Sequence, residues 1–409
     1  MEELPIGRRV AYWRGRRRLS QQVFADRLGK SKSWVDKVER GVRRLDKFSV
    51  VYEIADVLQV DVQLLLSREP ERRPDGIVAI DQVEVEEIRA ALERYDHISA
   101  FFHAPAQPPP LTEMRKAVTH AWLTYQHAKY GVLARALPWL LRQAQAADAA
   151  YRDRPERGEA ANLLGQVYQI ASSTLGKLGQ HDLAWLAADR SVGVAQRAGD
   201  PLLAGIATYR VGSSLLALGR ARPALEVNVN IANRLATSNG EGSTPAGLSV
   251  YGMLLLSGAM AAARLGDSAT VRDLVAGANE AARAVGGDYN HYWTCFGPTN
   301  VQLHKAAAAV ELGDGRAAVD THERIDGEGF ASLLPERRAH HYLEITRAYT
   351  QIGDVAKASE LLLEGNRLAP SEIRYRPLAH EVLADVLRRT RGAPPPPIAE
   401  LAEDLGVGV

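Results

Sequence analysis

Residues 19–41, LSQQVFADRLGKSKSWVDKVERG, decide the fold of the first part of the chain. Ser20 and Ser31 each stand where a helix is expected to begin, and a serine hydroxyl at that position bonds the first unpaired backbone amides. Gly29 and Gly41 each follow a helix, as glycines with left-handed backbone do. The stretch therefore predicts two short helices joined through a glycine turn, the arrangement of a helix-turn-helix.

The flanking residues supply further short helices. Apolar residues recur at helical spacing over residues 6–18, and two more helices are expected over 46–58 and 61–66. Residues 1–50 carry fourteen Lys/Arg against six Asp/Glu, a net charge of +8, so the remainder carries −7 of the total +1. A basic first part on an acidic body indicates that this part meets a polyanion.

This region resembles the lambda-repressor-like (XRE-type) helix-turn-helix domains over roughly residues 5–67. The resemblance implies that Gln21 opens the second helix and contacts phosphate. It also implies that Glu39, in the closing sequence Glu-Arg-Gly, pairs with Arg14 of the first helix. Double-stranded DNA is then the expected partner.

Helical geometry divides the third helix into two faces. Val35 and Val38 are expected to face inward, and the N-terminal part of such a helix enters the major groove. We predict base contacts from Lys32, Ser33, Trp34 and Lys37. Trp34 could instead be a half-buried wedge against the preceding helix. We predict phosphate contacts from Gln21, Ser31, Arg40, Arg43 and Arg44, with Asp36 solvated.

The rest of the chain predicts a helical repeat array. A Pro/Gly-rich linker with one amphipathic helix over 81–102, either a tether or part of a dimer interface, separates the two parts. The predicted domains are 1–67, 68–110, 111–392 and a disordered tail at 393–409, after a last helix over 376–391. Beyond the linker, a turn glycine is followed five residues later by a small residue. These pairs are Gly131/Ala136, Gly179/Ala184, Gly219/Ala224, Gly266/Val271, Gly313/Ala318 and Gly353/Ala358.

The repeat resembles the tetratricopeptide repeat, most closely over residues 342–370. The expected fold class is all-α, a five-helix helix-turn-helix domain followed by a right-handed tetratricopeptide-like α-solenoid. This layout resembles the peptide-pheromone receptors of the RRNPP type, which implies quorum sensing, and many bacterial regulators. A dimer, a peptide or small-molecule effector and a cytoplasmic, nucleoid-associated protein are the expectations. The uncharged stretch 242–263 is expected to be a core helix rather than a membrane span.

Counting back from the turn glycines gives a polar lining for the concave face of the array. The predicted effector-binding residues are Gln166, Gln169, Lys177, Tyr209, Arg210, Arg264, Asn300 and His304. Amides could bond a peptide backbone, and cations, including Arg347, a carboxylate or phosphate. Each of these residues alone is more often a solvated helix position, and the set on one face is better evidence than any single member. The aromatic cluster over 289–296 could rim a pocket or pack a long loop.

The sequence contains only partial matches to catalytic and metal-binding motifs. Residues 28–31 end like a phosphate-binding loop, but Phe24 occupies the position of its first glycine. His340 and Glu344 lie one helical turn apart without an evident third metal ligand. The single cysteine, Cys295, rules out an intramolecular disulfide and has no evident base partner. We therefore expect no enzyme activity, no cofactor and no metal.

The leading hypothesis is a sequence-specific transcriptional regulator that dimerises and senses an effector through its repeats. One rival is an adaptor whose array grips a protein while the first domain tethers it to DNA. Another is a constitutive repressor without effector.

Overall fold

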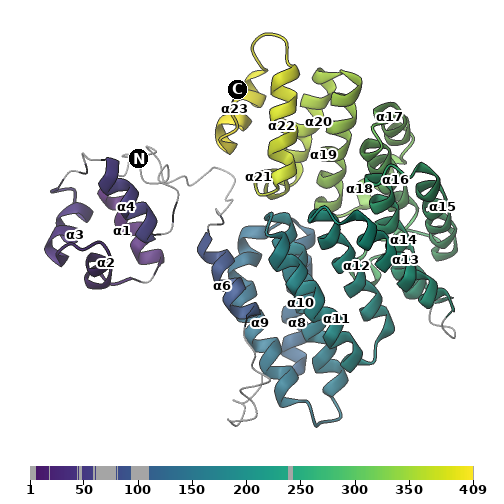
Figure 1. Ribbon diagram of the computed structural model, residues 1–409, viewed down its shortest axis with the longest axis horizontal. Helices are drawn as coiled ribbons and strands as arrows, with labels where there is room; N and C mark the ends of the chain where they lie inside the picture. Colours follow the sequence, from purple (N-terminus) through teal and green to yellow (C-terminus); the bar gives the residue numbers. More distant parts are fainter. Residues whose placement is uncertain are drawn as a thin grey trace. The chain divides into compact units, whose positions relative to one another are not determined.

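A computed structural model describes residues 6–17, 19–43, 45, 48–58, 60, 80, 82–93, 110–237 and 243–408. Within these residues the regular secondary structure is helical, apart from an isolated bridge between Tyr289 and Phe296. The chain divides into two compact units, Met1–Glu87 and Ile88–Val409 (Figure 1). The predicted all-α fold is confirmed.

The first unit has the predicted helices around one core. Its first four described helices are α1 (Ile6–Arg16), α2 (Gln21–Arg27), α3 (Lys32–Glu39) and α4 (Phe48–Leu58). Their apolar faces meet in a core that includes the fully buried side chains of Val10, Phe24, Val35, Ile54 and Leu58. The helix predicted over 61–66 lies outside the described residues, as does the Pro/Gly-rich part of the linker.

Both predicted helix caps are confirmed. The Ser20 hydroxyl accepts a hydrogen bond from the Val23 amide at 3.2 Å, and the Ser31 hydroxyl accepts one from the Trp34 amide at 3.1 Å. Gly29, in the turn between α2 and α3, has a φ of 60°, a left-handed conformation that glycine adopts without a steric penalty. These local interactions fix where α3 begins.

The linker helix is shorter than expected in the described residues. Helix α6 spans Gln82–Leu92, whereas the prediction ran over 81–102, of which residues 94–102 are not described. Ile88 and Leu92 are fully buried, and the Gln145 side chain donates to the Ala91 carbonyl at 3.0 Å. The C-terminal half of α6 therefore packs on the repeat array.

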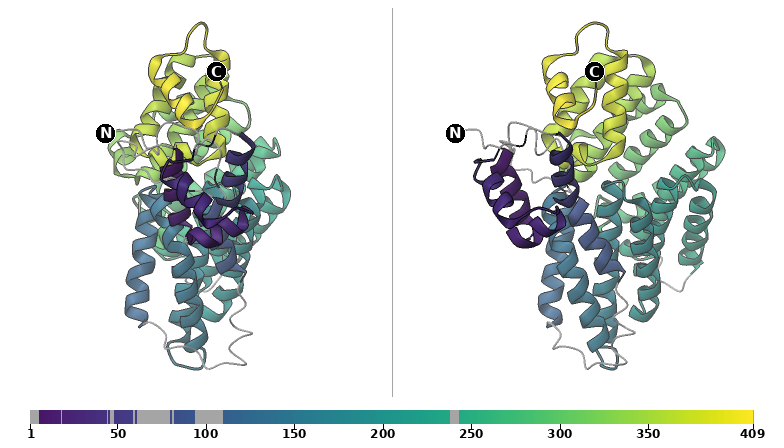
Figure 2. Two further views of the ribbon diagram at one scale, coloured as in Figure 1. Left: turned by 90° about the vertical axis from the view of Figure 1, so that its left-hand side faces the viewer. Right: turned by 60° about the vertical axis from the view of Figure 1, so that its left-hand side comes forward.

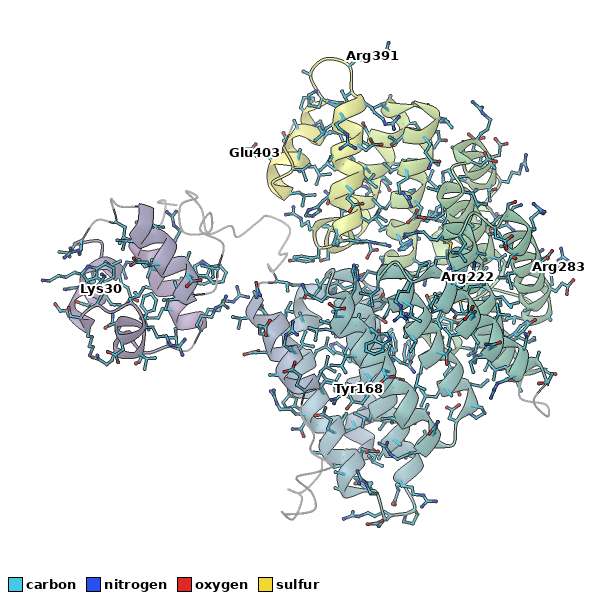
Figure 3. The ribbon with its side chains drawn as sticks, in the orientation of Figure 1. Lys30, Tyr168, Arg222, Arg283, Arg391 and Glu403 are labelled. Atoms are coloured by element: carbon cyan, nitrogen blue, oxygen red, sulfur yellow. The ribbon has the colours of Figure 1, made fainter. Side chains whose placement is uncertain are left out.

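The second unit is a stack of helical pairs. Its helices are α8 (Leu111–Gln126), α9 (Tyr130–Ala150), α10 (Arg157–Lys177), α11 (His181–Ala198), α12 (Pro201–Ala217), α13 (Ala221–Thr237), α14 (Pro245–Arg264), α15 (Ser268–Val285), η2 (His291–Trp293), α16 (Pro298–Glu311), α17 (Gly315–Glu323), α18 (Gly327–Ser332), α19 (Pro335–Ile352), α20 (Val355–Leu368), α21 (Pro370–Arg374), α22 (Pro377–Arg389) and α23 (Pro396–Leu405). Successive pairs pack side by side, as in a tetratricopeptide-like solenoid (Figure 1). Charged side chains such as Arg283 and Glu403 lie on its exterior (Figure 3).

The predicted turn glycines are confirmed at five of the six positions. Their φ angles lie between 73° and 84°, at Gly179, Gly219, Gly266, Gly313 and Gly353. The small residue five positions later is buried in each case, at Ala184, Ala224, Val271, Ala318 and Ala358. Glycine at the turn and a small side chain in the seam together let each helix pair cross closely.

The prediction for Gly131 is wrong. Gly131 lies inside α9, and Ala136 is exposed. Ala128 takes the left-handed conformation of this turn with a φ of 54°, and Leu133, five residues later, fills the buried position. A search keyed on glycine missed the turn because its left-handed residue carries a side chain.

The predicted disordered tail is also wrong. Prolines open α23, where a missing amide hydrogen costs nothing at the first helical positions. Ile398, Leu401 and Ala402 on one face of α23 are buried against α22, where Leu383 is fully buried. The proline run therefore begins a last packed helix after α22, which lies where a closing helix was expected.

The two ends of the array meet. The Tyr130 hydroxyl in α9 donates to the Glu372 carboxylate in α21 at 2.6 Å, across 242 positions of sequence. A side chain on Gly179 would clash with Pro377, because the built Cβ atom lies 2.8 Å from the proline ring. The C-terminal helices thus lie next to α8–α10, as Figure 2 shows. This closure brings polar residues from both ends into one interior.

Helix α14 is a core helix, as expected. It is long and apolar enough to cross a membrane, but 78% of its most apolar window is buried inside the unit. Leu254, Leu256 and Phe296 are fully buried in the same cluster.

Candidate functional sites

Helix α3 presents one apolar face to the core and one polar face to solvent. Val35 and Val38 are buried, whereas Lys32, Ser33 and Lys37 are exposed. The three outward side chains come from the first six residues of the helix, the part that reaches base edges when such a helix enters a major groove. The structure therefore brings three of the predicted base-contacting residues to one accessible face.

Trp34 lies at the edge of this face. Its ring is half-buried and packs against the core of the first unit. The guanidinium carbon of Arg43 lies 5.8 Å from the centre of the Trp34 ring, at cation–π distance. This geometry favours the wedge interpretation of Trp34 and places the exposed Arg43 beside the start of α3.

A buried carboxylate ties α1, α2 and α3 together. Arg14 donates to Glu39 through Nε at 2.5 Å and through Nη2 at 3.0 Å, and Gln21 donates to the same carboxylate at 2.8 Å. The pairing of Arg14 with Glu39 implied by the resemblance is confirmed. One amide hydrogen of Gln21 is used in this contact, which leaves its second amide hydrogen for another acceptor.

The remaining predicted phosphate contacts differ in their surroundings. Ser31 caps α3, so its hydroxyl oxygen already accepts one hydrogen bond. Arg40 forms an ion pair with Asp36 at 2.7 Å, with both side chains well exposed. Asp36 is exposed, as expected, and pairs with Arg40 at the surface. Arg44 lies outside the described residues.

Two of the predicted effector-binding residues are removed from the surface that a ligand could reach. Gln169 is 1% exposed and donates to the Ser191 hydroxyl at 3.2 Å. Asn300 is fully buried, and its side-chain amide approaches the Met253 sulfur at 3.6 Å. Both amides bond neighbouring helices because their positions face the seams between helices. The expectation that they bond a peptide backbone is corrected accordingly.

Three of the four predicted anion-binding cations are already paired with carboxylates. Lys177 donates to the carboxylates of Glu336 at 2.6 Å and Glu372 at 2.5 Å. Arg264 pairs with the Glu311 carboxylate. Arg347, which belonged to the same predicted lining, contacts Glu311 and Glu344 at 2.7 Å and 2.6 Å.

An aromatic wall surrounds Gln166. The rings of Trp122 and Trp293 stack with centres 5.6 Å apart and planes 17° apart. Both indole nitrogens donate to the Gln166 side-chain oxygen, at 3.2 Å and 3.1 Å. The predicted ligand contact Gln166 is thus the anchor that orients two tryptophans.

Arg210 is held by rings rather than by carboxylates. Its guanidinium carbon lies 5.5 Å from the centre of the Trp122 ring and 4.8 Å from that of Tyr209. Among the described residues no carboxylate pairs with Arg210, and its Nε is enclosed without a hydrogen-bond partner. Of the four cations predicted to bind an anion, Arg210 alone keeps its charge uncompensated in this part of the chain.

A cleft opens next to α16 and α19 on the interior of the array. We call it the interior cleft, and it is lined by Leu303, His304, Ala307, Arg337, His340, His341 and Glu344. It encloses about 250 Å³, part of which is open to solvent. His304, the last predicted effector-binding residue, therefore does line an accessible space. Burial, together with the nearby Arg337 charge, lowers its pKa to about 4, so the ring is neutral at pH 7.

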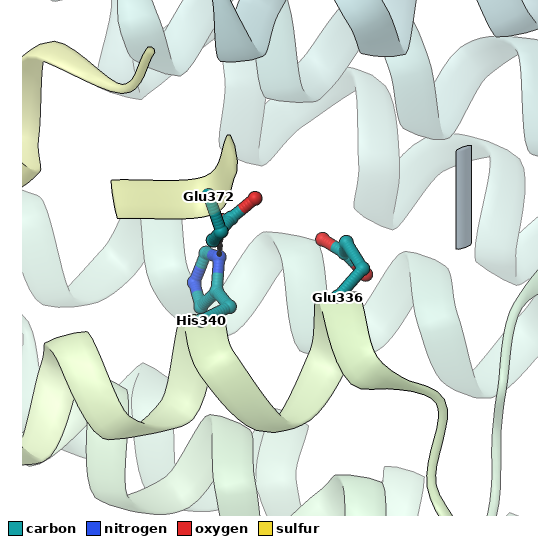
Figure 4. Close-up of side chains that lie close together, drawn as sticks. All are labelled: Glu336, His340 and Glu372. Carbon is teal, nitrogen blue, oxygen red and sulfur yellow. Dashed lines mark ion pairs between the residues drawn. The ribbon is translucent and has the colours of Figure 1, made fainter. Parts of the chain in front are cut away.

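An ion-pair cluster adjoins this cleft, formed by Lys177, Glu336, Glu372, Arg376 and His340. Glu336, His340 and Glu372 point toward one another with a geometry that could hold a metal ion (Figure 4). However, the Lys177 ammonium bonds both carboxylates, and Arg376 donates to Glu372 at 2.7 Å. A metal ion would have to displace the lysine, so this donor set does not fit a metal site.

The cluster keeps His340 neutral. Burial is the main cause that lowers its pKa well below 6.5, and the charges of Arg376 and Lys177 add to the effect. The His340 Nδ1 atom faces the donors of both cations, which requires an unprotonated nitrogen.

The long loop before α16 carries backbone strain. Tyr292, Trp293 and Cys295 have φ angles of 49°, 61° and 50°, which residues with bulky side chains rarely adopt. The Tyr292 hydroxyl donates to the Asp200 carboxylate at 3.0 Å, so this loop is tied to α12. The aromatic cluster over 289–296 was expected either to rim a pocket or to pack a long loop, and its residues differ in this respect. Phe296 packs in the core, whereas Trp293 joins the aromatic wall.

Sequence reasoning missed four residues of this interior, namely Trp122, Glu336, Arg337 and Glu372. Arg337 and its neighbour lie in the first turn of α19, before the positions counted back from the turn glycine. Glu372 belongs to the short helix α21, which has no counterpart in the repeat pattern. These residues meet only because the array closes on itself, and no local pattern signals that closure.

Comparison with known proteins identifies the first unit. A family described as a helix-turn-helix domain matches residues 5–66. The match spans α1–α4 and includes the exposed face of α3. The chain is therefore a DNA-binding regulator with a helix-turn-helix domain, followed by a tetratricopeptide-like helical array.

No curated protein matches the chain. Among solved structures, the crystal structure of Bacillus thuringiensis PlcR in complex with the peptide PapR7 and DNA is similar. The two chains are 11% identical with a TM-score of 0.31, and the alignment covers 91% of this chain and 99% of that chain. No functional residue follows from a likeness of this degree.

Proposed function

We propose that this protein is a transcriptional regulator that binds a two-half-site operator as a homodimer and senses a peptide or small-molecule effector in its helical array. The exposed polar face of α3 is the observation that carries the proposal. One such module reads few base pairs, so two copies are needed for useful specificity. The closed interior of the array, with charged and aromatic residues, supports an effector site there.

The base edges are contacted by Lys32, Ser33 and Lys37, and Trp34 lies at the edge of this contact between α3 and DNA. Lysine donates to guanine O6 and N7, and serine can pair with several base edges. Gln21, Ser31, Arg40, Arg43 and Arg44 are proposed to hold phosphates and thereby to set the register of α3 in the groove.

The effector acts through the arrangement of the array. A ligand shifts the balance between two arrangements only when it binds one of them more tightly. The proposed arrangements differ in the spacing of the two helix-turn-helix domains within the dimer, and hence in affinity for the operator.

Operator selection tests the proposal. Random duplexes selected on the full chain should yield paired half-sites about 10–10.5 base pairs apart, or a multiple of that spacing. Lys32→Ala and Lys37→Ala should each weaken binding to the selected duplex by about 5- to 150-fold, the value of a good base contact. Lys357→Ala, on the exposed surface of α20, is the matched control. Unchanged affinity of both α3 variants would remove this helix from base reading.

A salt titration separates phosphate contacts from base contacts. Arg43→Ala should weaken binding to all sequences about equally and reduce the salt slope by about one unit. An effect confined to the selected operator would instead place Arg43 among the base readers.

A further inference from the structure

Two tryptophans of the helical array are exposed to solvent. The chain has six tryptophans, all within the described residues, and only Trp139 in α9 and Trp185 in α11 are exposed, at 52% and 40%. An exposed tryptophan forgoes most of the apolar burial that this large side chain contributes in cores and interfaces. Because single exposed apolar residues are common on protein surfaces, the residues around each tryptophan decide whether it marks an interface.

In α9 the exposed tryptophan lies between two arginines. Arg135 stands four residues before Trp139 and Arg142 three residues after it, and both arginines are exposed. Residues three and four apart share one face of a helix, so the three side chains form a single stripe, which we call the basic stripe. Val132, which is 52% exposed, extends the same face by two turns. Tryptophan and arginine are the residue types that most often dominate the energetics of protein interfaces.

In α11 the exposed tryptophan lies between two aspartates. Asp182 stands three residues before Trp185 and Asp189 four residues after it, and both aspartates are exposed. These three residues form the acidic stripe. Within the described part of the chain neither aspartate is engaged in an ion pair, and the same holds for Arg142 of the basic stripe. The charges on the two stripes therefore remain available to a partner.

The two stripes match each other when their helices run in opposite directions. The tryptophan is four residues after the first charge and three before the second in α9, and the order of these spacings is reversed in α11. One antiparallel register therefore aligns all three positions, pairing Arg135 with Asp189, Trp139 with Trp185, and Arg142 with Asp182. The two charges of each stripe are seven residues apart, about 10.5 Å along a helix, so both ion pairs form together.

The stripes of one chain do not pair with each other. Helices α9 and α11 both pack on α10 (Figure 1). Asp148 and Arg197, near the C-terminal ends of α9 and α11, form an ion pair at 2.7 Å. Because these ends lie together, the two helices run in the same direction within the chain, whereas the matching register needs opposite directions. A second copy of the chain supplies the antiparallel helix.

We propose that the basic stripe of one protomer packs on the acidic stripe of a second copy, and that two such reciprocal contacts form the dimer interface. A twofold axis makes both contacts identical, which is how most homodimers close. The tryptophans supply an apolar centre, and the ion pairs at the rim fix the register. This inference rests on the homodimer of the proposed function and names its contact surface.

Charge reversal on the full chain tests the pairing. Arg142→Asp and Asp182→Arg each place like charges opposite one another in both contacts of the homodimer, so each should raise the dimer dissociation constant about 100-fold in sedimentation velocity. A mixture of the two variants should recover the wild-type affinity, because opposite charges then meet in both contacts of the mixed dimer. Arg283→Asp, at an exposed position of α15, is the matched control and should leave the constant within about twofold.

The mixture makes this test specific to the pairing. A variant that merely disturbs folding cannot be rescued by a second disturbed variant. Single reversals that leave the dimer intact overturn the proposed interface, and so does a mixture that dimerises no better than its two components.

Truncation of the tryptophans tests the apolar centre. Trp139→Ala and Trp185→Ala should each raise the dissociation constant about 30-fold, the size of an interface hot spot. Leu265→Ala removes a leucine that is exposed to the same 40% as Trp185, and it should leave the dimer unchanged. Unchanged dimerisation of both tryptophan variants, with helical circular dichroism retained, would overturn the proposal.

Operator binding by the same variants separates this interface from the proposed function. Loss of the dimer with unchanged affinity for the two-half-site operator supports the interface and contradicts the need for a homodimer on DNA. A dimer that survives every stripe variant, in a protein whose operator binding is lost on Lys37→Ala, supports the proposed function and contradicts the interface.

Discussion

The cations of α3 and the cations inside the array are used in opposite ways. Lys32 and Lys37 stand exposed, where water solvates them until a polyanion arrives. Lys177 is 9% exposed and is held by Glu336 and Glu372. The same residue type therefore reads a partner in one unit and holds two ends of a solenoid together in the other. Burial and pairing distinguish these roles, and charge alone does not.

This comparison also sets apart the two arginines of the interior. Arg210 and Arg337 are half-buried; Arg337 lies 3.9 Å from the Glu336 carboxylate, which Lys177 also bonds, whereas no carboxylate among the described residues pairs with Arg210. Arg210 therefore combines partial burial with a charge that no described carboxylate pairs.

The largest effect is expected for Lys177→Ala. Loss of the ammonium leaves Glu336 and Glu372 buried with one cation fewer, and removal of one partner from a buried pair costs about 3–5 kcal/mol. Chemical denaturation measures the free energy of unfolding. Lys37→Ala, with its exposed ammonium, should change that free energy by less than about 0.5 kcal/mol while it weakens DNA binding. A loss below about 1 kcal/mol for Lys177→Ala would break the comparison.

Acid should destabilise the array through its buried histidines. The folded-state pKa is lowered from 6.5 to about 4 for His304 and to about 3 for His341, in both cases mainly by burial. Below pH 6.5 the two histidines become protonated in the unfolded chain but stay neutral in the folded chain. The free energy of unfolding therefore falls as the pH drops toward the folded-state pKa values. When fully titrated, His304 can contribute about 3 kcal/mol and His341 about 5 kcal/mol to this loss.

Melting temperature recorded between pH 7.5 and pH 4 checks this expectation. His341 is hydrogen-bonded to His322 at 3.0 Å, a contact that needs at least one neutral ring. His341→Asn should flatten the pH profile relative to the wild type. A profile that is equally steep in this variant would assign the acid sensitivity to other groups.

Local patterns predicted what local interactions determine. Ser20, Ser31 and Gly29 lie where helix caps and a turn require those residue types, and the structure bears out all three. The five confirmed turn glycines follow from the same kind of rule. The failures at Ala128 and in α23 have different causes. Ala128 adopts a left-handed conformation that a residue with a side chain does not favour, whereas the proline run before α23 opens a helix whose apolar face is stabilised by packing on α22.

The interior site could be predicted only in part. Lys177, Arg210 and His304 do face the interior, but the sequence could not show which cations have carboxylate partners. That distinction depends on Glu336 and Glu372, which lie more than 150 positions beyond Lys177. Pairing across such a distance is set by how far each helix pair rotates against the next, and no single repeat encodes that closure.

The packing of the strained loop gives a smaller effect. A side chain on Gly252 in α14 would meet the ring of Phe296, whose nearest atom lies 2.0 Å from the built Cβ. Gly252→Ala should therefore destabilise the protein by about 1–3 kcal/mol. Gly193 in α11 is exposed with open space around it, so Gly193→Ala should stabilise by about 0.5–1 kcal/mol. Thermal unfolding of the two alanine variants, with shifts of the same sign, would contradict this packing.

The smallest effect distinguishes the residue that caps α3 from a residue of α3 that is proposed to contact bases. Ser31→Ala removes the hydroxyl that caps the helix and should destabilise the first unit by about 1 kcal/mol. Ser33→Ala, two residues later on the exposed face, should leave stability within about 0.5 kcal/mol and relax the base preference of the operator. Chemical denaturation combined with repeated operator selection measures both quantities. If Ser33→Ala preserves the selected sequence while Ser31→Ala alters it, base reading starts at Ser31, one residue earlier than proposed, because the cap and the contact would then be the same residue.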